Sequence, residues 1–179
     1  MRLLLAPVGF IDALSNGAAW CARWCVLLAC LVCAGNAVLR YLLSMGSNAW
    51  LELQWYLFAF LVLFGAAHTL RQNAHVRVDL IYGRLSQRGQ LWLDLVCLVI
   101  FLMPATLLLA WMSWPLFIES WRVDEVSGNA GGLLRWPVKL MLPVGFALLA
   151  LQGLAEIARR AAMLAGAIPV SVHYERPLQ

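Results

Sequence analysis

The stretch "WLELQWYLFAFLVLFGAAHTLRQNAHVRVDLIYGRLSQRGQ", residues 50–90, decides the fold class of this chain. Its first half, residues 50–70, is almost wholly apolar and meets the length of about 20 residues that a bilayer crossing requires. Its second half, residues 71–90, holds four arginines and a single acid, Asp79. An apolar run that ends in a basic loop is typical of a membrane helix whose basic edge stays at the cytoplasmic surface.

The composition of the whole chain agrees with a membrane protein. Of its 179 residues, 63% are hydrophobic and 12% are charged, and the mean hydropathy is +0.79. Soluble domains carry about 25% charged residues, so this chain has too few to cover a water-exposed surface. The net charge of +4 does not indicate nucleic acid, because the basic residues lie at the edges of apolar runs, where they meet lipid headgroups.

Four apolar segments are long enough to span a bilayer, and we expect an all-α integral membrane protein. The predicted spans are residues 18–39, 50–70, 91–118 and 139–157, within one membrane domain of residues 18–158. Residues 159–179 form a tail. Pro104 is expected to kink the long third span, and Pro115 to stop it or bend it again.

The N-terminal segment, residues 1–17, allows two interpretations. Arg2 precedes a short apolar run, as in a signal peptide. Pro7, Gly9 and Asp12 interrupt that run. We therefore favour a short amphipathic helix that lies at the membrane interface.

Basic residues predict the orientation of the chain. The loop after the second span holds four arginines, and the tail holds Arg159, Arg160 and Arg176, whereas the other two loops are less basic. Positive residues in short loops are retained on the cytoplasmic side, so both termini should be cytoplasmic.

The basic inner loop has an amphipathic pattern of its own. Val78, Ile81, Tyr82 and Leu85 fall at i, i+3, i+4 and i+7, which predicts a short helix on the inner surface. The alternation in "HVRVDL" at its start is equally compatible with an extended segment.

Cysteines and histidines suggest two cofactor hypotheses, neither of which the sequence favours. "CLVC", residues 30–33, has the spacing of a metal or redox motif, but it lies within the first span with no histidine or carboxylate beside it. Haem between facing helices requires a pair of intramembrane histidines. The three histidines, His68, His75 and His173, lie near a span end, in a loop and in the tail, so we expect no cofactor.

Two acids lie near span ends, and we expect local structural roles for them rather than an ion path. Glu52 falls in the first turn of the second span, where the helix dipole favours a carboxylate and where Arg40 is a candidate partner across a short loop. Asp94 lies near the start of the third span, within reach of Arg71 or Arg88. The sequence has no paired catalytic carboxylates, no Ser/His/Asp set and no phosphate-binding loop, so an enzyme is not expected. Spans without deep charges also make a poor autonomous transporter, and they favour a partner of another protein.

The loop between the third and fourth spans, residues 119–139, combines mixed charge with glycines. It is either a plain connector or a surface that docks a partner, and the sequence does not favour one over the other. The residues that such a docking surface would use are Glu119, Arg122, Asp124, Glu125, Gly131 and Gly132.

These features, in this order, resemble the small membrane subunit (DctQ-like) of tripartite ATP-independent periplasmic (TRAP) transporters. The similarity rests on residues 50–90, with Glu52 at the start of a span and His75 and Asp79 in an HxxxD pattern after it. It also rests on "NAGGL", "WPVKLMLPVGFALLALQG" and the residues before them, within residues 120–153. About residues 40–160 are covered. Ala74 stands directly before His75 where the resemblance suggests a glycine nearby.

The resemblance implies a subunit that does not itself bind substrate. A large membrane subunit would hold the substrate and sodium sites and move them in elevator fashion, while a periplasmic binding protein delivers an organic acid. This chain would brace the large subunit in the bacterial inner membrane, and His75 and Asp79 would hydrogen-bond and shape the inner loop. The competing class is an independent four-helix membrane protein, such as a haem or quinone anchor or a small channel.

The expected orientation is tested by cysteine labelling in a background without the five native cysteines. A cysteine at Ser127 should react with a membrane-impermeant thiol reagent added to intact cells whose outer membrane has been removed. A cysteine at Ser86 should react only after the cells are lysed. The opposite pattern would reverse the predicted topology.

Overall fold

The computed structural model describes residues 2–74, 82 and 84–169. Its elements are α1 (Arg2–Leu43), α2 (Asn48–Arg71), α4 (Gln87–Cys97), the π-helical turn η1 (Leu98–Leu102), α5 (Met103–Arg122) and α6 (Trp136–Leu164). Four helical stretches are long and apolar enough to cross a membrane, with α4, η1 and α5 together forming the third. The predicted all-α architecture of four spans is confirmed.

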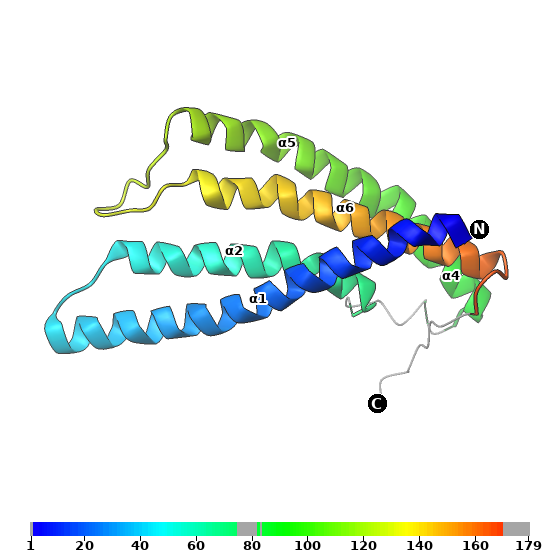
Figure 1. Ribbon diagram of the computed structural model, residues 1–179, viewed down its shortest axis with the longest axis horizontal. Helices are drawn as coiled ribbons and strands as arrows, with labels where there is room; N and C mark the ends of the chain where they lie inside the picture. Colours follow the sequence, from blue (N-terminus) through cyan, green and yellow to red (C-terminus); the bar gives the residue numbers. More distant parts are fainter. Residues whose placement is uncertain (1, 75–81, 83, 170–179) are drawn as a thin grey trace.

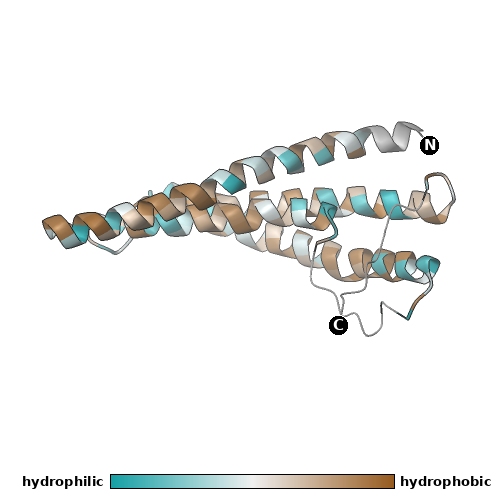
Figure 2. Cartoon of the chain, turned by 90° about the horizontal axis from the view of Figure 1, so that it is seen from below, coloured by the Kyte–Doolittle hydropathy of each residue, from teal (hydrophilic) through white to brown (hydrophobic). Residues whose placement is uncertain are grey.

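The helices form an open row in which α6 contacts every other helix (Figure 1). At the end that holds residues 44–47 and 123–135, here called the hairpin end, α5, α6, α2 and α1 lie side by side. At the opposite end, here called the network end, α1 crosses toward α6. In an apolar 18-residue stretch of α6, 44% is buried inside the molecule, against 6% to 11% of the corresponding stretches of the other three spans. The core of the molecule therefore follows α6, and the outer helices leave broad apolar faces for lipid or for a partner (Figure 2).

Helix α1 runs without a break through the segment that the sequence analysis placed at the interface. Pro7 lies within its first two turns, where it removes few intrahelical bonds. Val8, Ser15, Ala22 and Asn36 are buried and recur at multiples of seven residues. Such a repeat keeps one seam of the helix against its neighbours, so the N-terminal part of α1 is held by protein contacts.

The third span contains the irregularity expected near Pro104. The turn η1 is π-helical and ends directly before α5, whose second residue is Pro104. Proline has no N–H to donate to the carbonyl four residues earlier, which favours a departure from α-helical bonding at this point. Pro115 does not stop the helix, because α5 continues to Arg122.

Helix α5 contacts α6 through a narrow seam of hydroxyl side chains. Thr106, Ser113 and Ser120 are buried and lie seven residues apart. The hydroxyls of Thr106 and Ser113 donate to the carbonyls of Leu102 and Leu109, at 2.8 and 2.6 Å, so their polarity is satisfied within the helix. Small side chains allow the two helices to approach closely where the hydrophobic effect gives no drive to association.

The predicted inner-loop helix falls largely on residues 75–81 and 83, outside the described part of the chain. His75 and Asp79 lie there too, and the expected contact between them stays a prediction. Tyr82 is buried, and its carbonyl accepts a hydrogen bond of 3.0 Å from the Gln90 side chain at the start of α4.

Gly145 sets the distance between α2 and α6. A Cβ atom at Gly145 would lie 2.7 Å from the Leu63 Cβ and 3.4 Å from the Leu63 carbonyl carbon. Carbon atoms do not approach so closely without displacement, so only glycine permits this crossing. Gly65 on α2 contrasts with it, because a Cβ there would meet nothing within 4 Å.

We predict that Gly145→Leu destabilises the helix bundle by about 1–3 kcal/mol, because the added side chain forces α2 and α6 apart. Gly65→Leu is the matched control and should leave stability nearly unchanged. Thermal unfolding of both variants in mild detergent measures the difference. Equal melting temperatures for Gly145→Leu and the unaltered chain would show that the two helices are not held at this distance.

Candidate functional site

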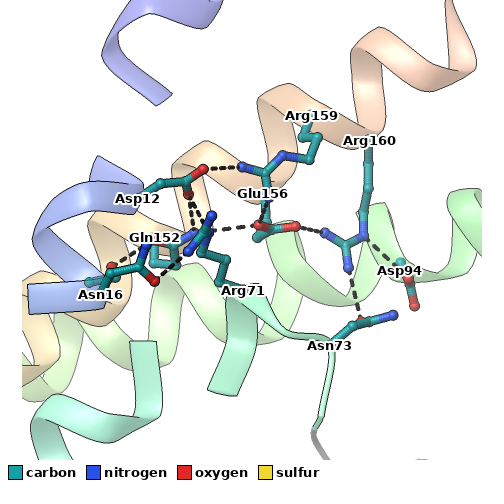
Figure 3. A network of polar contacts seen from close by, with 10 residues as sticks. Asp12, Asn16, Arg71, Asn73, Asp94, Gln152, Glu156, Arg159 and Arg160 are labelled. Carbon is teal, nitrogen blue, oxygen red and sulfur yellow. Dashed lines mark hydrogen bonds and ion pairs between the residues drawn. The ribbon is translucent and has the colours of Figure 1, made fainter. Parts of the chain in front are cut away.

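Polar side chains from four helices meet at the network end (Figure 3). They form one connected set of hydrogen bonds and ion pairs, here called the network. Its members are Asp12, Ser15 and Asn16 from α1, His68 and Arg71 from α2, Asn73 after α2, Asp94 from α4, and Gln152, Glu156, Arg159 and Arg160 from α6.

The centre of the network is one face of α6. Gln152, Glu156 and Arg160 follow one another at i, i+4 and i+8 and are 0%, 3% and 4% exposed. Residues four apart lie above one another on a helix, so the three side chains form a polar line within the apolar core. Arg160 Nη1 donates to Glu156 Oε2, and Gln152 Nε2 lies 3.4 Å from Glu156 Oε1.

Helix α1 joins this line through Ser15 and Asp12. The Ser15 hydroxyl donates to Gln152 Oε1 at 2.7 Å, with both residues fully buried. Gln152 Nε2 donates in turn to Asp12 Oδ1 at 3.1 Å. Arg159 bridges Asp12 and Glu156, with Nη2 at 2.7 Å from Asp12 Oδ2. The N-terminal part of α1 is thus tied to the C-terminal part of α6.

Helix α2 enters the network at its last turns. Arg71 Nε lies 3.3 Å from Asp12 Oδ1, and Arg71 Nη1 donates to the Asn16 side-chain oxygen. The ring nitrogen Nδ1 of His68 lies 3.1 Å from the same Asn16 oxygen. The C-terminal turn of α2, where backbone carbonyls favour positive charge, therefore packs its basic side chains against α1.

Helix α4 is attached through Asp94 and Arg160. Arg160 Nε lies 3.2 Å from Asp94 Oδ2, and Arg160 Nη2 donates to Asn73 Oδ1 at 3.3 Å. The Tyr82 hydroxyl donates to the same Asp94 oxygen at 3.2 Å. A single guanidinium therefore reaches α4, α6 and the segment that follows α2.

The network is electrically balanced. Its three carboxylates, Asp12, Asp94 and Glu156, face three guanidinium groups, Arg71, Arg159 and Arg160, so the formal charges cancel. Burying a charge in a medium of low polarity is costly unless a partner and further hydrogen bonds accompany it. The arrangement satisfies both conditions, and its ion pairs hold α1, α2, α4 and α6 together.

This network corrects two expectations from the sequence. The membrane helices do carry buried charges, namely Glu156 and Arg160 in the network and Glu52 on α2. Asp94 was expected to pair with Arg71 or Arg88, but it pairs with Arg160, while Arg71 pairs with Asp12. Glu156 lies within the predicted span 139–157, but its partners Arg159 and Arg160 were assigned to the tail, so the pairing was not expected. The i, i+4, i+8 spacing of a glutamine, a glutamate and an arginine was the available signal.

A second polar site lies at the hairpin end, where Glu52 holds the loop between α5 and α6. Glu52 Oε1 accepts from the Ser127 hydroxyl and, at 2.7 Å, from Asn129 Nδ2. Glu52 Oε2 accepts from the Leu133 backbone N–H at 2.7 Å. Glu52 is 3% exposed. We call this set of contacts the Glu52 clamp.

Two more residues of α2 extend the clamp along the helix. Asn48 Nδ2 donates to the Ala130 carbonyl at 3.2 Å, and the Tyr56 hydroxyl donates to the Leu134 carbonyl at 2.9 Å. Asn48, Glu52 and Tyr56 are spaced four residues apart, so one face of α2 binds the loop over two turns.

The suggested pairing of Glu52 with Arg40 is wrong, because the Glu52 carboxylate binds the loop between α5 and α6. The Arg40 side chain lies against Gly46 instead, where an added Cβ would be 3.7 Å from Arg40 Cδ. Helix α2 also begins at Asn48, which places Glu52 beyond its first turn. Ser127 is buried in the clamp, so Gly128, which is exposed and open to a Cβ, is the better position for cysteine labelling.

The loop has an internal structure that requires its glycines. Gly131 has a φ of +69°, which an L side chain adopts only with strain, and a Cβ on Gly132 would lie 2.5 Å from the Ser127 Cβ. Leu133 O accepts from the Ser127 N–H at 3.0 Å. Gly131 and Gly132 therefore shape the loop. Glu119, Arg122 and Asp124 are exposed and remain the part of the suggested docking surface that is open to a partner.

Glu125 belongs to the loop's own contacts. Its carboxylate binds the Lys139 ammonium and lies 3.6 Å from Arg135 Nη1. The Lys139 contact holds the pKa of the Glu125 carboxyl below its ordinary value. A lowered pKa in the folded chain means that the contact stabilises the loop at neutral pH, and that this stabilisation is lost as the pH falls through the lowered value.

The cysteines and histidines bear on the two cofactor hypotheses. All five cysteines are free thiols, and four of them are exposed on the helix surface. His68 is the only histidine within the described residues, and its ring contacts Asn16. Across the described ranges, no group of three or more His, Cys, Asp or Glu residues is placed to hold a metal ion.

Fold and sites together define a multi-pass helical membrane protein whose polar groups fasten its own helices. A family model matches residues 28–163, and its description is "Tripartite ATP-independent periplasmic transporters, DctQ component". The match covers most of the chain, and the chain belongs to this family. Comparison with curated proteins and with solved structures found no significant match.

We predict that Arg160→Gln destabilises the isolated chain by about 3 kcal/mol or more, because Glu156 and Asp94 lose their shared partner while Glu156 stays buried. Arg88→Gln, on the exposed surface of α4, is the control and should cost less than about 0.5 kcal/mol. Thermal unfolding in detergent measures both. A double variant, Arg160→Gln with Glu156→Gln, should recover part of the loss; if it is as unstable as the sum of both single losses, the two residues are not coupled.

Proposed function

We propose that this chain is the small membrane subunit that braces the large membrane subunit of a TRAP transporter in the bacterial inner membrane. The observation that carries the proposal is the self-contained pairing of charges. Buried acids and arginines of the membrane helices bind one another, and they connect α1, α2, α4 and α6. Carboxylates that are paired with arginines and hold helices together are suited to a subunit that does not change conformation. A site that binds and releases ions needs carboxylates that can exchange their partners.

In this proposal, the chemistry of transport belongs to other chains. The large membrane subunit binds the substrate and sodium and changes conformation, and a periplasmic binding protein delivers an organic acid. This chain needs no cofactor of its own, and its membership of a transporter-component family favours this role over that of an enzyme.

The proposed orientation places the network end in the cytoplasm. Arg84 and Arg88 are exposed near the start of α4, close to the inner loop, and suit contact with anionic headgroups. The hairpin end then faces the periplasm, where Trp121 and Trp136 pack edge to face with ring centroids 4.5 Å apart. Tryptophan pairs at this level anchor helices at the membrane interface.

The loop held by the Glu52 clamp is proposed to meet the partners on the periplasmic side. The clamp fixes the loop backbone from residue 127 to residue 134. The exposed charges of Glu119 and Arg122, at the end of α5, and of Asp124 directly precede this clamped segment. Preformed charged surfaces raise the specificity of association more than its strength.

The test is the effect of Glu52→Ala on assembly and on transport. We expect the variant to lower the amount of complex recovered with the large subunit, because the clamped loop loses its position. The substrate affinity of the complex that does assemble should be unchanged in uptake assays with the purified transporter. Trp55→Ala, an exposed residue one turn from Glu52, is the matched control and should assemble normally.

Two results would contradict the proposal. One is normal assembly with an altered sodium dependence of uptake, which would assign Glu52 to an ion path. The other is recovery of the unaltered chain from native membranes without any large membrane subunit.

A further inference from the structure

A small groove lies on α1 near the hairpin end. Its volume is about 230 Å³, and it is lined by Leu31, Val32, Gly35, Asn36 and Leu39 of α1 and by Trp50 of α2. Sites for drug-sized molecules and cofactors usually measure about 300–1,000 Å³. The groove is therefore suited to one or two side chains.

Asn36 is a buried polar residue of this groove whose amide has no hydrogen-bond partner among the described residues. It is 8% exposed, and no residue in the described ranges forms a hydrogen bond with its side chain. The helix-borne glutamines behave differently, since Gln54 donates to the Ala29 carbonyl and Gln90 to the Tyr82 carbonyl. An amide inside a membrane finds no water, so leaving it unpaired is costly. The occupant of the groove should supply a hydrogen-bonding group.

Gly35 opens the groove, although the packing of this chain does not require a glycine there. A Cβ at Gly35 would meet nothing within 4 Å, whereas one at Gly145 would lie 2.7 Å from the Leu63 Cβ. Glycine weakens a helix relative to alanine because it is conformationally freer in the unfolded chain. Because Gly35 has no side chain, a notch remains between Leu31 and Leu39, which lie one turn away on either side. A side chain from outside can enter this notch.

We propose that a transmembrane helix of the large membrane subunit crosses α1 at Gly35, inserts an apolar side chain into the groove and hydrogen-bonds with the Asn36 amide. A lipid tail would fill the groove but offers no hydrogen-bonding group. Contacts between membrane helices, in contrast, are built on small residues and on amide side chains. This inference rests on the proposed function for the identity of the partner chain.

Photocrosslinking in the complete transporter tests the contact directly. Benzoylphenylalanine replaces Leu39, which is 42% exposed at the rim of the groove, or Ala37, which is exposed two residues away and does not line it. Irradiation of native membranes should give an adduct with the large subunit from position 39 and not from position 37. Adducts from position 39 with lipid alone, or with a second copy of this chain, would overturn the inference.

Two substitutions separate an interface role from a structural one. Asn36→Leu and Gly35→Leu should each lower the recovered complex about tenfold. Neither should lower the melting temperature of the isolated chain, since the Asn36 amide has no partner in the described part of the chain and a Cβ at Gly35 would meet nothing within 4 Å. Gly17→Leu, at another open glycine of α1, is the control and should leave assembly unchanged. Loss of stability in isolated Asn36→Leu would assign the amide to the chain's own core and overturn the inference.

The two proposals fail in distinguishable ways. If the unaltered chain does not recover the large subunit, the proposed function fails, and this inference fails with it. If the large subunit is recovered normally from Asn36→Leu and Gly35→Leu, only the groove contact is disproved.

Discussion

The ion pairs between Arg160 and the carboxylates of Glu156 and Asp94 are the interaction on which the arrangement of the helices depends. In a membrane, apolar surfaces give little drive for helices to associate, because lipid tails are as apolar as leucine. Polar contacts and close packing must therefore define which helices touch. Arg160 is placed on α6, the helix that contacts all the others, and its three nitrogens reach three different segments. The network makes one body of helices that would otherwise pack weakly.

The helices are held together at both ends of the molecule, by ion pairs at one end and by hydrogen bonds to a loop at the other. At the network end, balanced charges connect α1, α2, α4 and α6. At the hairpin end, the Glu52 carboxylate accepts three hydrogen bonds from a loop that links α5 and α6. Between them, Gly145 allows α2 and α6 to approach. Fastening at both ends with close contact in the middle leaves little freedom for relative movement, which suits the bracing role proposed for this chain.

The number of spans, the helical class and the family resemblance followed from the sequence, because apolar runs of sufficient length have few alternatives in a bilayer. The partners of the charges did not follow. Glu52 was noted for its place near the start of a span, but its true partners lie 75–81 residues further along, in a loop whose fold the sequence does not disclose. Asp12 was treated as an interruption of an apolar run, although it binds Arg159 after a separation of 147 residues. Such contacts depend on how the helices cross.

The central claim is that the four spans form one body that does not rearrange during transport. Distances between spin labels at exposed positions 13 on α1 and 161 on α6 test it most directly, in a cysteine-free background of the complete transporter in lipid nanodiscs. Both positions lie beside the network, so opening of its ion pairs would separate them. The account predicts one narrow distance distribution that is the same without sodium, with sodium, and with sodium and substrate-loaded binding protein. A distribution that shifts or splits when sodium or substrate is added would contradict it, and would make this chain a moving part of the transporter.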